Sequence, residues 1–129
     1  MRKMKNSKGF TLMEMLIVVA IIAILVAIMI PTLTTQLERA RETADLANIR
    51  SAYAEAMVNA LTGDTGSGES TTTVTMTQTK AGFKYVTDIP DYLKSGTTWS
   101  DVADATKGAT IKVAVDVEGK VSFTVTPKP

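Results

Sequence analysis

Lys8-Gly9-Phe10-Thr11-Leu12-Met13-Glu14 opens a long apolar segment near the start of this 129-residue chain. Before the segment stand four cations and no acid: Arg2, Lys3, Lys5 and Lys8. Behind the quoted stretch, Met15 to Ile30 forms sixteen apolar residues without a break. Glu14 is the only charged residue in the whole apolar block. This pattern predicts one hydrophobic helix that begins close to a positively charged amino-terminal end.

The apolar segment is long enough to cross a membrane. It contains 21 residues, from Phe10 to Ile30, and a helix rises ~1.5 Å per residue against a hydrocarbon thickness of ~30 Å. The positive-inside rule places the four cations in the cytoplasm and the carboxyl end outside. A secretory signal would end in a small-residue cleavage site after the apolar core, and residues 27–31 (AIMIP) contain none. The segment is therefore expected to stay in the mature protein, and an uncleaved single-pass anchor is one interpretation.

A plain anchor does not explain Glu14. One carboxylate at membrane depth costs about 2.5–3.5 kcal/mol on insertion scales and usually has a functional partner. Cleavage between Gly9 and Phe10 would create an α-amine one helical turn before this carboxylate. Pairing of Glu14 with such an amine is favoured over a carboxylate that merely reaches toward the lipid headgroups.

These residues resemble the processing site of type IV pilins and pseudopilins. The resemblance rests on Gly9, Phe10, Thr11, Leu12 and Glu14, followed by the apolar run and Pro31. It implies a leader, residues 1–9, that a membrane prepilin peptidase removes after Gly9 before it N-methylates Phe10. It also implies that the mature chain polymerises through its hydrophobic helix, with Glu14 paired to the terminal amine of a neighbouring subunit. Beyond about residue 62, no family-specific motif is recognisable.

The same resemblance implies partners and a location. The precursor would sit in the bacterial cytoplasmic membrane, in contact with lipid, and the assembled subunit would lie in a cell-surface filament. Assembly would require further copies of the chain, an assembly ATPase and a platform protein. In the family, the proline at the position of Pro31 lies where the helix loosens on assembly. Because proline lacks the backbone donor and clashes with the preceding turn, a helix kink is expected at Pro31.

Composition excludes several function classes. The chain has no cysteine and no histidine, which removes disulfides, thiol nucleophiles, imidazole bases and the common zinc ligand sets. Removing the four leader cations turns the net charge of +1 into −3, and no basic stripe for nucleic acid is visible. No phosphate-binding loop or catalytic dyad occurs, so neither an enzyme nor a cofactor is expected. Many pilins close a carboxyl-terminal loop with a disulfide, and this chain departs from them.

Residues 32–61 read as an amphipathic continuation of the helix. No glycine lies between Phe10 and Thr62, and Pro31 is the only proline there. Two stripes at helical spacing are visible, one of Leu33, Leu37, Ala40, Ala44 and Ala47, the other of Leu46, Ile49, Tyr53, Met57 and Leu61. The second stripe is expected to pack on the protein's own sheet, while the alanine-rich first stripe permits close approach of a neighbour. Among the interleaved charges, Arg41 and Asp45 have the spacing of a helical ion pair.

Residues 62–129 are expected to form a small β-rich domain. Residues 62–73 (TGDTGSGESTTT) read as a flexible connector. Strands are predicted at residues 73–77, from alternation, and at Phe83–Val86. Residues 111–126 predict a hairpin in which Val117-Glu118-Gly119 is the loop and Gly119 is left-handed. This register opposes Val115 to Val121, Val113 to Phe123 and Ile111 to Val125, which places one apolar face toward the helix.

Two further patterns in this domain suggest structural roles. The run Thr98-Trp99-Ser100-Asp101 has the spacing of a capping box and predicts a short helix to Lys107, stopped by Gly108. Trp99 is then expected in the core. Five aspartates lie in expected loops: Asp88, Asp91, Asp101, Asp104 and Asp116. Some secretion pseudopilins bind calcium near their carboxyl ends, but these spacings match no EF-hand loop, so turn formation is favoured and no metal site is expected.

The sequence therefore predicts an α+β, type IV pilin-like fold. A long amino-terminal helix would have one hydrophobic half, residues 10–31, in the membrane or filament core. Its amphipathic half, residues 32–61, would pack on a small antiparallel sheet. Functionally, the sequence predicts a filament subunit that serves adhesion, motility or DNA uptake. A pseudopilin of a type II secretion or competence system is the first alternative, and an anchored binding module that never polymerises is the second.

Overall fold

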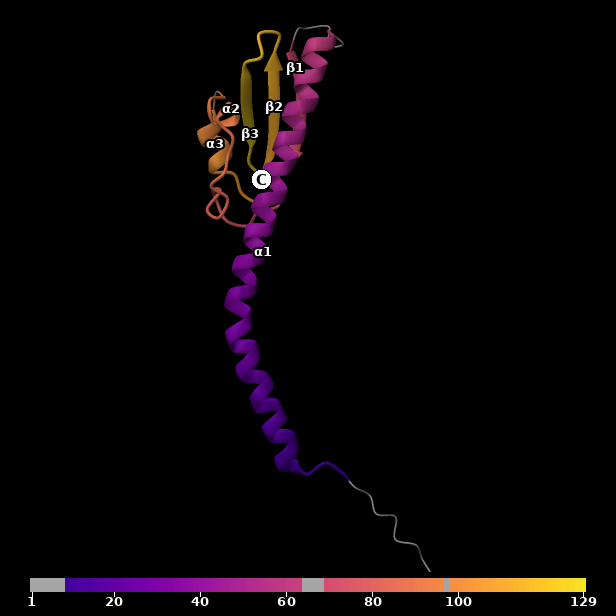
Figure 1. Cartoon of the computed structure of the whole chain (residues 1–129), viewed down its shortest axis with the longest axis vertical. Coiled ribbons are helices and arrows are strands. Elements are labelled where there is room, and N and C mark those ends of the chain that lie inside the picture. Colours follow the sequence, from indigo (N-terminus) through magenta and orange to yellow (C-terminus); the bar gives the residue numbers. More distant parts are fainter. Residues whose placement is uncertain (1–8, 64–68, 97) are drawn as a thin grey trace, which may run out of the picture. The chain divides into compact units, whose positions relative to one another are not determined.

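The computed structural model describes residues 9–63, 69–96 and 98–129. The described chain contains one long helix, three strands and two short helices (Figure 1). It divides into two compact units, residues 1–35 and residues 36–129. Helix α1, Leu12–Thr62, contributes residues to both units. The architecture is α+β and consistent with the type IV pilin fold, as the sequence predicts.

Helix α1 has 51 residues and continues through Pro31. Its length follows from the absence of glycine along the segment, since glycine lowers helix stability by roughly 1 kcal/mol per residue. The hydroxyls of Thr34 and Thr35 both donate to the Pro31 carbonyl, at 2.9 and 3.1 Å. The helix is not interrupted at Pro31, and the expected kink stays a prediction.

The sheet is antiparallel, with strand order β1-β2-β3. Its strands are β1, Glu69–Thr75; β2, Thr110–Asp116; and β3, Val121–Thr126. The pairing of β2 with β3 is the predicted one: Val115 opposes Val121, Val113 opposes Phe123 and Ile111 opposes Val125. Gly119 has a φ of 81°, the left-handed value that the three-residue loop requires. The hairpin prediction is confirmed.

The core of residues 36–129 lies between α1 and the apolar face of the hairpin. Ile49, Ala56, Ile111, Val113 and Val115 are each 0% exposed. The second helical stripe packs here as predicted, with Leu46 and Ile49 buried and Tyr53 and Met57 packed at the margin. Leu61 does not follow it and is 76% exposed, whereas its neighbour Ala60 is buried in the core. The first stripe is exposed throughout.

Trp99 joins the core from the side of β3. Its ring stacks on Phe83 at a centroid distance of 6.1 Å and meets Phe123 edge-on at 5.3 Å. Such aromatic pairs add about 0.5–1.5 kcal/mol each beyond the area they bury. The expectation that Trp99 anchors the small domain is confirmed.

Two short helices, α2 (Asp91–Lys94) and α3 (Trp99–Ala103), lie beside β3 (Figure 1). The predicted capping box at Thr98 is wrong. Thr98 has a left-handed backbone, with φ of 66°, and its hydroxyl donates instead to the carbonyl of Phe123. Helix α3 ends at Ala103 rather than at Lys107, and the N–H of the next residue, Asp104, donates to the Asp101 carbonyl at 3.3 Å.

Two predicted strands also differ from the structure: one has other bounds and one does not form. Residues 69–73, expected within the connector, belong to β1, because ladder pairing with Ala114–Asp116 and neighbouring residues of β2 outweighs the polar composition. The remaining central part of the predicted connector, residues 64–68, lies outside the described residues. The strand predicted at Phe83–Val86 does not form, since the backbone donors of Tyr85 and Val86 bind the Glu42 carboxylate rather than a neighbouring strand.

Candidate functional site

The amino-terminal site begins with an exposed, non-helical segment and a reciprocal cap. Gly9 and Phe10 precede α1, and the Phe10 side chain is 80% exposed. The Thr11 N–H donates to Glu14 Oε2 at 2.8 Å, while the Glu14 N–H donates to Thr11 Oγ1 at 3.2 Å. This capping box satisfies two backbone donors that a helix start otherwise leaves unpaired.

The cap gives Glu14 a partner within its own chain. The sequence prediction assigned Glu14 only an amine partner and missed the role of Thr11. The signal was present, because Thr11-Leu12-Met13-Glu14 has the threonine-to-glutamate spacing of a capping box before an apolar run. One Glu14 oxygen is engaged by Thr11, which leaves the other carboxylate oxygen available to a second donor.

The helix after the cap presents apolar side chains on every side. Bulky residues from Leu12 to Ile30 are exposed, among them Leu12 at 84% and Ile28 at 68%. This part of α1 is long and apolar enough to span a membrane. Along one face, small Ala20 and Ala23 lie among larger side chains and leave a shallow apolar groove of about 420 Å³ lined by Leu12, Met15, Leu16, Val19, Ala20 and Ala23. A surface of this kind requires lipid or other protein to cover it.

The second polar feature is a row of buried carboxylates on α1. Glu38, Glu42 and Asp45 are 2%, 0% and 0% exposed, and their spacing places them on one side of the helix. Together they accept hydrogen bonds from six backbone N–H groups of residues 77–86: Thr77, Gln78, Thr79, Lys80, Tyr85 and Val86. We call Glu38, Glu42 and Asp45 the carboxylate clamp, since they hold the segment that follows β1 against α1.

Asp45 holds the start of this segment. Its two oxygens accept the Thr77 N–H at 3.0 and 2.9 Å, the Thr77 hydroxyl at 2.7 Å and the Gln78 N–H at 2.8 Å. The side-chain NH₂ group of Gln78 lies within hydrogen-bond distance of three backbone carbonyls, including that of Ala105 at 3.0 Å. Asp45 is thus engaged by backbone rather than by Arg41, and the predicted Arg41–Asp45 ion pair is wrong.

Glu38 holds the next turn and pairs with Arg41. It accepts the N–H groups of Thr79 and Lys80 at 2.5 and 2.6 Å, and Arg41 lies 3.2 Å from its Oε2. Burial of the Glu38 carboxylate opposes ionisation, but the hydrogen bonds from Thr79, Lys80 and Arg41 outweigh it and lower the pKa of Glu38 from 4.5 to about 2. Glu38 is therefore an ionised, structural acceptor at neutral pH.

Glu42 lies between these two contacts. Its Oε2 accepts the Tyr85 and Val86 N–H groups at 2.6 and 3.0 Å, while Oε1 is buried and has no hydrogen-bond partner among the described residues. Sequence reasoning missed the whole clamp, because three acids at helical spacing usually indicate a solvated face.

The loop aspartates are dispersed. Asp91 lies 3.8 Å from Lys94, and Asp116 Oδ1 accepts the N–H groups of Glu118 and Lys120 at the hairpin loop. The described residues contain no group of three acidic side chains that could hold a metal ion. Asp116 therefore acts as the turn former that its position suggests.

The amino-terminal part of the chain is similar to known proteins. Residues 4–30 match the family described as the prokaryotic N-terminal methylation motif. Through its amino-terminal part, the chain is homologous to type IV pilins.

Two relatives from Thermus thermophilus show this homology. The chain is 60% identical over 40 residues to PilA4, the type IV wide pilus major component, with 31% of this chain and 30% of PilA4 covered. It is 53% identical over 58 residues to PilA5, the type IV narrow pilus major component, with 43% of this chain and 50% of PilA5 covered. The matched parts thus span at most half of these relatives, and no solved structure matches the chain.

Proposed function

We propose that this chain is a prepilin that is cleaved after Gly9, N-methylated at Phe10 and assembled through α1 into a cell-surface filament. The observation that carries the proposal is the joint presence of the methylation motif and an exposed apolar helical segment, residues 12–30, directly behind it. The apolar face that lipid covers in the precursor would be covered by neighbouring helices in the filament. The relatives PilA4 and PilA5 are major components of pili, which favours a pilus subunit over a pseudopilin.

The exposed cleavage region fits this proposal. Gly9 and Phe10 precede the first helical turn, so a peptidase at the membrane surface can bind them in extended form. A Cβ added at Gly9 would meet nothing within 4 Å in the chain itself. A requirement for glycine at this position therefore comes from the peptidase and not from the fold.

Glu14 supplies the polar contact of assembly. In the monomer it caps its own helix through Thr11, and its second oxygen is able to receive the methylated α-amine of a neighbouring subunit. A charge-assisted hydrogen bond of this kind is about twice as strong as a neutral one, and in lipid it relieves the cost of an unpaired carboxylate. The chain itself would perform no catalysis, and its partners would be the prepilin peptidase, the assembly ATPase, the platform protein and further copies of itself.

Substitution of Glu14 tests this role. Glu14→Gln keeps a side-chain oxygen that can accept the Thr11 N–H but removes the negative charge. The variant should therefore be cleaved and inserted normally and yet give at least a tenfold lower yield of sheared filaments. Glu14→Asp serves as the matched control, because it keeps the charge and should retain part of the assembly. Wild-type filament yield from Glu14→Gln would contradict the proposed pairing.

A further inference from the structure

The two edges of the sheet are protected differently. On the β3 side, α3 packs beside the strand, and the Thr98 hydroxyl occupies the carbonyl of Phe123. On the β1 side, no described residue pairs with the outer edge of the strand. Natural edge strands usually carry lysine, proline or a bulge that discourages pairing, and β1 (ESTTTVT) contains no lysine and no proline. As far as the described residues show, the outer edge of β1 is thus open to another strand.

The register shows which backbone groups are free. Met76, just after β1, donates its N–H to the Ala109 carbonyl at 2.9 Å, so it faces β2. Because strand residues alternate, Val74, Thr72 and Ser70 face β2 in the same way. The N–H and C=O groups of Thr71 and Thr73 therefore point to the open edge, and no described residue binds them. They form a template for main-chain hydrogen bonds.

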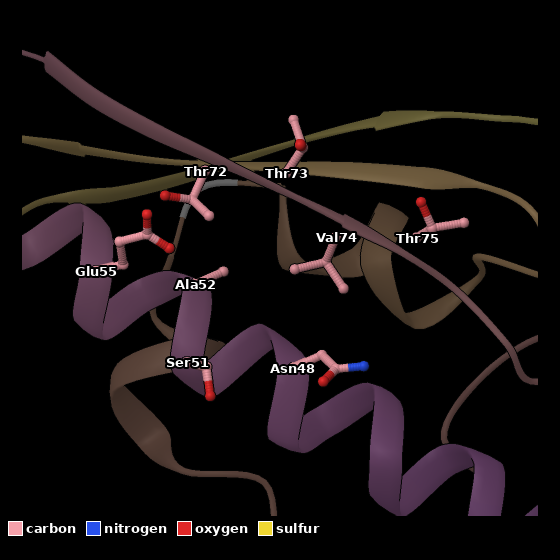
Figure 2. A pocket seen from close by; sticks show the side chains of 8 residues that line it. All are labelled: Asn48, Ser51, Ala52, Glu55, Thr72, Thr73, Val74 and Thr75. Atoms are coloured by element: carbon pink, nitrogen blue, oxygen red, sulfur yellow. The ribbon is translucent and has the colours of Figure 1, made fainter.

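A polar groove runs along this edge. It has a volume of about 310 Å³ and is lined by Asn48, Ser51, Ala52 and Glu55 of α1 and by residues 72–75 of β1. Figure 2 shows the Glu55 carboxylate and the Thr72 hydroxyl turned toward one another across the groove, with Val74 pointing toward α1. Glu55 is the only charged residue in the lining, and Glu69 adds a second acid at the start of β1.

We propose that the edge of β1 is a docking site for an extended, basic peptide segment of another polypeptide, which adds to the sheet as a fourth strand. Main-chain pairing with Thr71 and Thr73 supplies the affinity, and a lysine or arginine opposite Glu55 supplies the selectivity. The acid in the lining favours a basic partner over a second copy of β1, which would bring its own Glu55 and Glu69 to the interface.

Two labelled peptides test this proposal on the full-length chain in detergent micelles: TKVTVKT and its acidic counterpart TEVTVET. Fluorescence anisotropy should show the lysine peptide binding with a dissociation constant of about 10–100 μM, near the weak end of specific recognition. The acidic peptide should bind at least about tenfold more weakly, since like charges at an interface are unfavourable. Glu55→Lys should reverse this preference, and because Glu55 lies on α1 the substitution leaves the strands of the sheet unchanged.

A proline tests the backbone template directly. Thr73→Pro removes one outward N–H and leaves the ladder to β2 intact, because the Thr73 donor does not face β2. It should lower peptide affinity about tenfold, the value of one hydrogen bond in a binding constant. Thr73→Val is the matched control, as it also lacks the hydroxyl but keeps the N–H, and it should bind like the wild type.

Three results would overturn the proposal. The first is no binding of either peptide at about 1 mM, far above the expected dissociation constant, by protein with native Trp99 fluorescence. The second is an equal loss of peptide affinity in Thr73→Pro and Thr73→Val, which would show that the backbone N–H of Thr73 does not contribute to binding. The third is self-association of the wild type that Thr73→Pro abolishes, which would make a second copy the occupant.

Discussion

Thr11 and Glu14 hydrogen-bond each other reciprocally, with the Thr11 N–H donating to the Glu14 carboxylate and the Glu14 N–H donating to the Thr11 hydroxyl. The one acid in the apolar segment is thus held in place before any neighbour is present. Because the contact starts α1 immediately after the proposed cleavage point, it fixes the carboxylate one turn from the future amine. The cap therefore prepares the monomer for the proposed pairing.

Substitution of Thr11 should loosen the start of α1. Thr11→Val removes the acceptor for the Glu14 N–H, and loss of such a cap costs about 1 kcal/mol. Amide hydrogen exchange at Glu14 should accelerate about fivefold, the factor that corresponds to this free energy. Thr11→Ser keeps the hydroxyl and should exchange like the wild type. Equal exchange rates in all three proteins would show that the cap does not form in solution.

Substitution of Gly9 should block processing without affecting the fold. Gly9→Val should accumulate uncleaved precursor, because a side chain at Gly9 meets open space in the chain and can clash only with the peptidase. Immunoblotting of membranes resolves the two forms by mass. Asn6→Val, within the proposed leader, is the control and should be cleaved. Normal cleavage of Gly9→Val would contradict the assignment of the site.

Asp45 should be the most sensitive member of the carboxylate clamp. Asp45→Asn replaces one acceptor of the Thr77 and Gln78 donors by an NH₂ group, which leaves buried donors facing each other. We expect a loss of about 2–4 kcal/mol in the free energy of unfolding, typical of a broken buried network. Urea unfolding followed by Trp99, the only tryptophan, measures the change. Glu118→Gln, on the exposed hairpin loop, should change it by less than about 0.5 kcal/mol.

The stability contributed by Glu38 should depend on pH. Because the pKa of Glu38 is lowered from 4.5 to about 2 in the folded protein, its contribution is fully present above pH 4.5 and is lost as the pH falls toward 2. The shift corresponds to about 3 kcal/mol. In urea unfolding, the difference between wild type and Glu38→Gln should be largest at neutral pH and shrink across this window. A difference that stays constant from pH 7 to pH 2.5 would contradict ionised Glu38 as the acceptor.

The long helix and the hairpin could be predicted from the sequence because local patterns dominate there. The helix has no glycine to interrupt it, and the hairpin register follows from aligning Val115, Val113 and Ile111 with apolar partners around Gly119. Both signals depend on neighbours in sequence, and tertiary contacts reinforce them.

The carboxylate clamp could not be predicted, because its partners lie 32 to 44 residues away. Glu42 and Asp45 look like solvated helix residues until residues 77–86 are placed over them. The same contacts explain the wrong strand at Phe83–Val86, whose backbone donors are taken by Glu42. The same capping-box pattern forms at Thr11 and Glu14. At Thr98 it does not form, because the backbone is left-handed and the hydroxyl donates to the Phe123 carbonyl.

The central claim is most directly tested by intact mass and amino-terminal fragmentation of the protein in a sheared cell-surface fraction. The proposed function predicts a chain that begins at N-methylated Phe10 and is recovered in that fraction. A chain that retains residues 1–9 and is found only in membranes would contradict it and would indicate a single-pass anchor.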